Sequence, residues 1–102
     1  MIELNLEISK GEDFSVFLPA TNLLGSTVKS EFGTVEHGEP IRVGDFSATI
    51  QPSGIRLTKL RSEIESIRNG AYRFDVLVER PDAHFPDGKS LSVEYRGILQ
   101  VG

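Results

Sequence analysis

The chain contains no cysteine and no tryptophan. The missing thiols exclude disulfide bonds, thiolate nucleophiles, and zinc or iron–sulfur sites with cysteine ligands. No apolar run approaches the roughly 20 residues needed to cross a bilayer as a helix. A small domain without covalent cross-links depends on its hydrophobic core, or on neighbours in an assembly.

A strong excess of charge of one sign is also missing. The 102 residues include 11 Lys and Arg against 15 Asp and Glu, a net charge of -4. Nothing in this balance favours nucleic acid or anionic lipid, so we expect neither a nucleic-acid nor a membrane partner. The segment Met1-Ile2-Glu3-Leu4 lacks the basic and apolar regions of a signal peptide, and synthesis in the cytoplasm is therefore expected. The length predicts a single domain over residues 1–102.

Alternation of apolar and polar residues predicts most of the chain to be β-strand. The alternating segments are residues 2–8, 14–18, 46–50, 55–57, 72–78 and 91–101, the last with one parity throughout. We expect the first two to pair as an opening hairpin, with a weaker strand at residues 27–32. Residues 33–44 hold three glycines and Pro40, which predicts either a long loop or a ragged edge strand.

One segment changes its period. Leu60, Ile64 and Ile67 follow the i, i+4, i+7 spacing of a helix face, which predicts a short helix at about residues 59–68. Thr58 is the expected N-cap. Several short strands with one short helix predict a mostly β fold, with a β-sandwich as the best architecture.

Five segments carry a recognisable order of turns and strands, namely residues 6–16, 57–67, 70–76, 87–88 and 97–101. This order resembles that of a known family, the immunoglobulin-like domains of tailed-bacteriophage virion proteins. The chain is similar to the N-terminal domain of phage baseplate upper proteins and to small tail, fibre and capsid-decoration modules. The resemblance implies an immunoglobulin-like antiparallel β-sandwich. The Gly70–Tyr72 pairing looks like a structural tyrosine corner, in which the hydroxyl of Tyr72 bonds to nearby backbone.

The best candidate for metal or acid–base chemistry is His84, which lies between Asp82 and Asp87. The alternative is a polar hairpin loop in which both carboxylates bond their own backbone. Since a catalytic metal site takes at least three well-placed ligands, we favour the loop and expect no metal, cofactor or catalytic residue. The only other histidine is His37, and no argument brings the two together. The chain also has no G-x-S-x-G elbow and no phosphate-binding glycine loop.

Two apolar residues, Phe17 and Ile98, oppose the parity of their neighbours. Each is either a contact point for a partner or part of a second buried face, because isolated exposed apolar residues carry little information.

The resemblance implies a non-enzymatic structural module of a tailed-phage virion, in the tail, baseplate, fibre attachment or capsid decoration. Its partners would be other virion proteins, bound through shape-complementary contacts and strand addition at an open sheet edge. We expect a homo-oligomer or multiple symmetric copies in the particle, after synthesis in the host cytoplasm. The alternative is a carbohydrate- or receptor-binding adhesin domain, although no tryptophan platform is available. An enzyme would need a cluster of titratable groups around His84.

Overall fold

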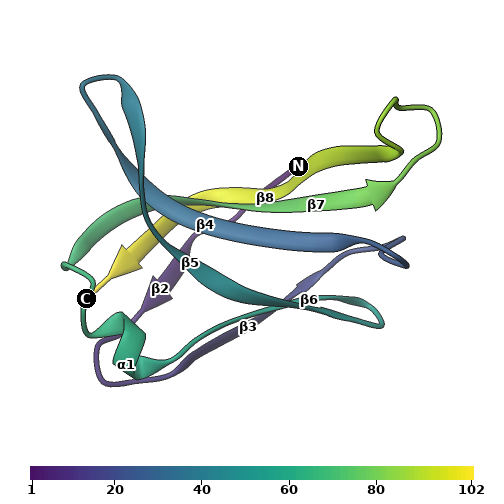
Figure 1. The fold of residues 1–102 in the computed structure, drawn as a ribbon. Helices are drawn as coiled ribbons and strands as arrows, with labels where there is room; N and C mark the ends of the chain where they lie inside the picture. The colour runs from purple at the N-terminus through teal and green to yellow at the C-terminus, as the bar shows by residue number, and fades with distance from the viewer.

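Eight β-strands and one helical turn make up the computed structural model, which describes all residues from 1 to 102. The elements are β1 (Ile2–Glu3), β2 (Leu6–Ile8), β3 (Phe14–Pro19), β4 (Thr27–Glu36), β5 (Glu39–Gln51), β6 (Gly54–Lys59), α1 (Arg61–Ile64), β7 (Gly70–Pro81) and β8 (Lys89–Val101). Along the curled sheet the strand order is β1-β8-β7-β4-β5-β6-β3, and β2 pairs with β8 beyond β1. Figure 1 shows β8, β7 and β4 in one layer and β6 and β3 in the other.

Strand β5 belongs to both layers. Residues 39–46 pair with β4, whereas residues 47–51 pair with β6. We call the layer of β1, β2, β8, β7, β4 and the first half of β5 sheet A. Sheet B comprises the second half of β5, β6 and β3. The chain passes from one layer to the other without a break in hydrogen bonding, as the long central ribbon in Figure 1 shows.

The pairing is that of an immunoglobulin-like sandwich. Strands β8, β7 and β4 correspond to the G, F and C strands, and the first half of β5 extends them as C′ does in variable domains. The second half of β5, β6 and β3 correspond to the D, E and B strands. All of these pairs are antiparallel, and only β1 and β2 run parallel to their partner β8. The expected mostly β sandwich with one short helix is confirmed.

The predicted opening hairpin is wrong. Strand β2 pairs with β8, and β3 pairs with β6, so the first two strands lie in different sheets. Leu6 and Ile8 face the core from sheet A, while Leu18 faces it from sheet B. Alternation showed which side chains are buried, but it carries no information on which strand is the neighbour.

The predicted helix over residues 59–68 is also wrong in its length. Only Arg61–Ile64 is helical, and Thr58, the expected cap, lies inside β6. The helical turn is capped instead by carboxylates, since Asp13 Oδ1 accepts from the Arg61 N–H at 2.7 Å. Ile64 in this turn and Ile67 in the irregular segment after it are buried and cover the end of the sandwich. Leu60, the third residue of the pattern, is exposed.

A β-bulge breaks the single parity expected for residues 91–101. Val76 lies opposite Tyr95, but Leu77 lies opposite Val93, so Glu94 is the extra residue. On the far side of the bulge, the residues of β8 that the alternation assigns to the core lie on the outer face. Val93 is therefore on the outer face, and the polar side chain of Glu94 turns inward.

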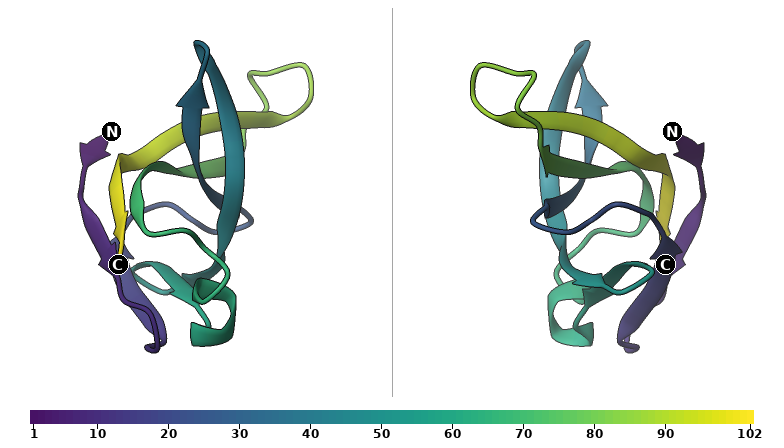
Figure 2. Two further views of the ribbon diagram at one scale, coloured as in Figure 1. Left: turned by 90° about the vertical axis from the view of Figure 1, so that its left-hand side faces the viewer. Right: turned by 90° about the vertical axis from the view of Figure 1, so that its right-hand side faces the viewer.

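Residues 33–44 form a long hairpin, so the edge-strand alternative describes them better than a loop. The turn His37-Gly38 has φ of 52° and 79°, the positive values that a two-residue type I′ turn requires. Gly33 marks a bulge, where a Cβ would lie 2.0 Å from the carbonyl oxygen of Ile41. Figure 2 shows this hairpin extending away from the rest of the domain.

Aromatic rings fill the space between the sheets. Phe46 lies 5.6 Å from Phe14, 5.4 Å from Phe32 and 6.4 Å from Phe74, measured between ring centroids. Tyr72 packs edge-on against Phe32, and its hydroxyl donates to the carbonyl oxygen of Arg68 four residues earlier. This hydrogen bond is the arrangement of a tyrosine corner. Two residues later, where antibody domains have a cysteine, stands Phe74.

We expect Tyr72→Phe to lower the free energy of unfolding by about 1–3 kcal/mol, because it leaves the carbonyl of Arg68 without its donor in a partly buried position. Thr49→Val is the matched control, since it removes an exposed hydroxyl from a strand. Urea denaturation of both variants measures the difference. Equal stability of the two variants would show that the corner hydrogen bond contributes nothing.

Candidate protein-interaction surface

The loop between β7 and β8 binds its own backbone. Asp82 Oδ1 accepts from the His84 N–H at 3.0 Å and lies 2.9 Å from its Nδ1 atom. Asp87 Oδ1 accepts from the Lys89 N–H at 3.2 Å. No group of three or more His, Cys, Asp or Glu is placed to hold a metal ion. His37 is in the hairpin turn, at the opposite end of the molecule in Figure 1, so the structure does not bring the two histidines together.

Phe17 and Ile98 lie on opposite sheets and form no common patch. Phe17 is half-buried on the outer face of sheet B, with the guanidinium of Arg56 5.6 Å from its ring centroid. Its ring also covers Gly54, where a Cβ would lie 2.7 Å from the ring. Ile98 is 41% exposed on the outer face of sheet A. Ile98 lies beside a concave surface.

That surface is a groove of about 700 Å³ on the outer face of sheet A. Its floor is formed by β4, β7 and β8. One side is made by Glu3 and Asn5 of the N-terminal segment, and the other by residues 33–35 and 40–42 of the projecting hairpin. We call this surface the sheet A groove. It was not predicted, because its residues come from five separate segments.

A row of charges crosses the outer face of sheet A, and all of its members except Asp45 line the groove. Asp45, Glu31, Asp75 and Arg96 are direct neighbours across β5, β4, β7 and β8, and Glu3 pairs with Arg96. Side chains directly opposite each other on adjacent strands lie on the same face, so the carboxylates of this row are close together. Three of the four acidic residues are adjacent, which gives this row an excess of negative charge.

The neighbouring row is basic and apolar. It comprises Arg42, Gly33, Arg73 and Ile98 in the same strand order. Arg42 forms ion pairs with Glu31 and with Asp45, the latter at 3.0 Å. Arg73 takes part in no ion pair, and neither does Arg96 in the acidic row. Arg96 nevertheless lies between Glu3 and Asp75 in the strand register, whereas Arg73 lies between Gly33 and Ile98 and has no carboxylate opposite it.

Asp75 is a partly buried carboxyl in the floor of the groove. Burial raises the pKa of its carboxyl above the usual value, and repulsion from Glu31 adds to this effect. A backbone hydrogen bond at Glu31 and the charges of Arg96 and Lys29 act in the opposite direction without cancelling it. A carboxylate that is partly desolvated and without an ion pair gains from a further cation or donor.

The projecting hairpin exposes aliphatic side chains that no core covers. Val35, Ile41 and Val43 are 54%, 42% and 44% exposed. The first half of β5 is an edge strand of sheet A. Pro40 has no N–H to donate, and charged residues flank it. Both features discourage another strand from pairing with this edge. This edge therefore offers side chains rather than backbone to a partner.

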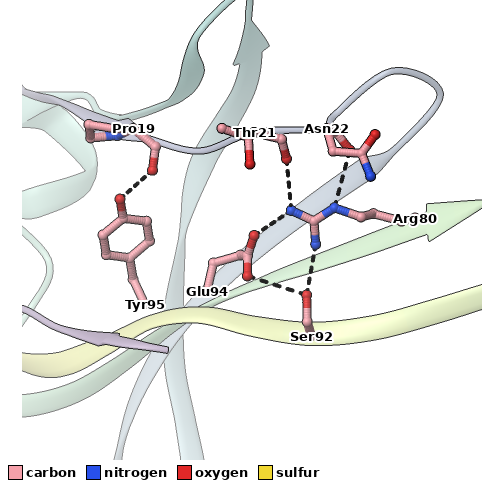
Figure 3. Close-up of polar contacts among 7 residues, drawn as sticks. All are labelled: Pro19, Thr21, Asn22, Arg80, Ser92, Glu94 and Tyr95. Atoms are coloured by element: carbon pink, nitrogen blue, oxygen red, sulfur yellow. Dashed lines mark hydrogen bonds and ion pairs between the residues drawn. The ribbon is translucent and has the colours of Figure 1, made fainter.

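At the other end of the sandwich, Arg80 fixes the loop between β3 and β4 (Figure 3). Its Nε donates to Asn22 O at 3.2 Å and its Nη2 to Thr21 O at 3.1 Å. The same guanidinium pairs with Glu94, and its Nη1 donates to Ser92 Oγ at 2.8 Å. This network could not be predicted from the hydrophobic pattern, because the bulge at Glu94 turns both acceptor side chains inward.

Tyr95 completes the attachment of this loop. Its hydroxyl donates across the sandwich to the carbonyl oxygen of Pro19, as Figure 3 shows. Burial raises the pKa of the Tyr95 hydroxyl, and the nearby charge of Glu94 raises it further. The loop that these bonds fix carries Leu24, which is 95% exposed.

Comparisons with known proteins add little to this description. No protein-family model matches the chain, and no curated protein matches it. Among solved structures it is similar to murine CRIg, with 12% sequence identity over 96% of this chain and 92% of that chain, at a TM-score of 0.49. The strand order and register define the fold. The helical turn α1, with four residues, is too short to span a membrane.

We expect Asp75→Asn to raise the free energy of unfolding at about pH 7, where the wild-type carboxyl is charged. A folded-state pKa above the unfolded value makes the charged form less stable in the folded chain, and this penalty disappears as the pH falls through the carboxyl range. The gain should therefore shrink toward zero at about pH 3. Asp45→Asn, at an exposed residue paired with Arg42, is the control and should give no gain. A gain for Asp75→Asn that is independent of pH would contradict this explanation.

Arg80→Ala should lower the free energy of unfolding by about 2 kcal/mol, because it removes hydrogen bonds to charged and backbone groups in a mostly buried position. Arg73→Ala removes an exposed arginine without an ion pair and should leave stability within about 0.5 kcal/mol of wild type. Denaturation of Arg80→Ala, of Glu94→Gln and of the double variant measures the coupling energy between the two side chains. Arg73→Ala is the control. Additive effects of the Arg80 and Glu94 substitutions would show that the pair is not a unit.

Proposed function

We propose that this chain is a non-enzymatic structural module of a tailed-phage virion, part of the tail, baseplate, fibre attachment or capsid decoration. It acts by binding other virion proteins. The observation that carries the binding role is the sheet A groove beside a projecting hairpin with three exposed aliphatic side chains. The virion assignment is supported by the resemblance of residues 6–16, 57–67 and 70–76 to domains of such particles.

The composition of this surface suits a protein partner. Protein interfaces combine an apolar centre with a polar, charged rim, and exposed aliphatic side chains gain free energy when a partner covers them. Here Val35, Ile41 and Ile98 supply apolar area, and Arg73 and Arg96 supply charges without ion pairs. The geometry also favours a partner that fills a concave surface.

A module of this kind works in several copies, because assemblies of identical chains are mostly symmetric. We propose that it is either a homo-oligomer or is held in multiple symmetric positions by a larger virion protein. It would be made in the host cytoplasm and then incorporated into the particle.

Light scattering of the purified protein, alone and mixed with the products of neighbouring genes, tests the proposal. We expect a defined oligomer or a stable complex with a virion protein. Replacing Val35, Ile41 and Val43 together by serine should weaken that association at least tenfold. Each substitution removes exposed apolar area that the partner would cover. Leu91→Ser, at an exposed residue outside the hairpin, is the control.

A monomer that binds no virion protein would overturn the proposal. In that case a glycan array decides whether the chain is instead the carbohydrate-binding adhesin domain that the sequence left as the alternative.

A further inference from the structure

We propose that two copies of this chain exchange residues 2–8, each copy laying this segment along β8 of the other. We call residues 2–8 the edge segment and residues 9–13 the hinge. The inference goes beyond the proposed function and does not depend on the virion assignment. The partner is a second copy, because the site on β8 fits this segment and a second copy carries the same one.

The site on β8 is matched to the edge segment in side chains and in backbone. Leu6 and Ile8 are buried in the core. At Gly97 a Cβ would lie 1.7 Å from the carbonyl oxygen of Leu4, so the segment crosses β8 at a residue without a side chain. Residues 2–8 of this chain therefore fit the site, whether they come from the same copy or from another.

The backbone bonds of the edge segment all go to one strand. The Leu4 N–H donates to the carbonyl oxygen of Arg96 at 2.9 Å, and Asn5 Oδ1 accepts from the Ile98 N–H at 3.2 Å between β1 and β2. Strands β1 and β2 pair with β8 and with no other strand, and Figure 2 shows this purple segment at the margin of the molecule beside yellow β8. The segment can leave without breaking any other strand pair, and the same bonds form again on a second copy. Reciprocal exchange closes a two-fold dimer.

The hinge joins two strands that do not pair with each other. Strand β2 pairs with β8 in sheet A, whereas β3 pairs with β6 in sheet B. Packed sheets lie about 10 Å apart, and an extended chain the length of the hinge spans up to about 17 Å. A straightened hinge therefore carries the edge segment past its own sandwich to a neighbouring one. The hairpins β4–β5, β5–β6 and β7–β8 join paired strands, which cannot separate without losing their own bonds.

Gly11 holds the hinge in its folded-back form. Its φ of 84° lies in the left-handed region that favours glycine, and the Glu12 N–H closes the turn on the carbonyl oxygen of Ser9 at 3.3 Å. A Cβ at Gly11 would meet no atom within 4 Å, so a side chain there would strain only the backbone of the turn. The extended hinge of the exchanged dimer does not need this conformation. Residue 11 therefore sets the balance between the closed monomer and the exchanged dimer.

Cysteine cross-linking tests the exchange directly, because the chain has no cysteine of its own. Glu7 and Gln100 are exposed and lie opposite each other in the pairing of β2 with β8. Glu7→Cys and Gln100→Cys are made in separate chains, unfolded in urea, mixed, refolded at high concentration and oxidised. Each chain then has one cysteine, so every disulfide joins two chains. We expect linked pairs of the two different variants, identified by mass spectrometry.

A second pair of single-cysteine chains is the control. Ser47→Cys and Thr58→Cys are opposite each other in the β5–β6 hairpin, whose strands are joined by a two-residue turn. Treated in the same way, they should link only at the level of random collision.

A hinge variant gives an independent readout. By analytical ultracentrifugation Gly11→Val should dimerise at least about tenfold more strongly than wild type, because the substitution strains the closed turn in each copy and leaves the extended hinge unstrained. Gly88→Val is the matched control, with φ of 77° and no atom within 4 Å of its Cβ. Its loop joins the paired strands β7 and β8, so the strain is equal in both forms and association should match wild type. Circular dichroism establishes that both variants are folded.

Cross-linking of Glu7→Cys with Gln100→Cys that does not exceed the control pair would overturn the inference. A Gly11→Val chain that dimerises no more strongly than Gly88→Val would also overturn it. Absence of exchange in a chain that still binds a virion protein would overturn the exchange and leave the proposed function standing. Exchange in a chain that binds no virion protein would support the inference while the virion assignment fails.

Discussion

Phe46 and the strand that carries it hold the two sheets together. The ring of Phe46 contacts Phe14 on sheet B and Phe32 and Phe74 on sheet A, so it bridges both layers of the sandwich. Each such ring pair contributes about 0.5–1.5 kcal/mol beyond the apolar area that it buries. In a chain without cysteine, these contacts stand where antibody domains have an inter-sheet disulfide and a buried tryptophan. The projecting hairpin depends on the same strand, since β5 leaves the hairpin and enters the aromatic core at Phe46.

Much of the core was predictable from the sequence, and the pairing was not. Alternation placed Tyr72, Phe74, Val76 and Val78 on the buried face of one strand, and all four are buried. The same signal was wrong at Val93, because one extra residue at the bulge exchanges the faces and leaves no mark in the hydrophobic pattern. Lys59, which the predicted helix included, instead ends β6 and is buried, with its amine bonded to the carbonyl oxygen of Asp45 at 2.7 Å. From its neighbours in the sequence alone, a lysine is expected at the surface.

The groove was even harder to predict from the sequence than the strand pairing. Its acidic row joins residues 31, 45 and 75, which become neighbours only through the register of three strands. Register depends on non-local pairing, so no window along the chain contains it. Two signals pointed toward the region: the off-parity Ile98, and the glycines and Pro40 of residues 33–44. The first marked exposed apolar area, and the second marked an edge with a bulge.

The parallel pairing of β1 and β2 with β8 has a mechanical consequence. Ile8 lies beside Val101 near the C-terminus, and Ile2 lies beside Tyr95, so the two ends of the chain leave this pair of strands in opposite directions. A force that pulls the ends apart loads the hydrogen bonds between these strands in shear, and they must rupture together rather than unzip one at a time. A domain tethered at both ends would resist extension far better than its thermodynamic stability suggests.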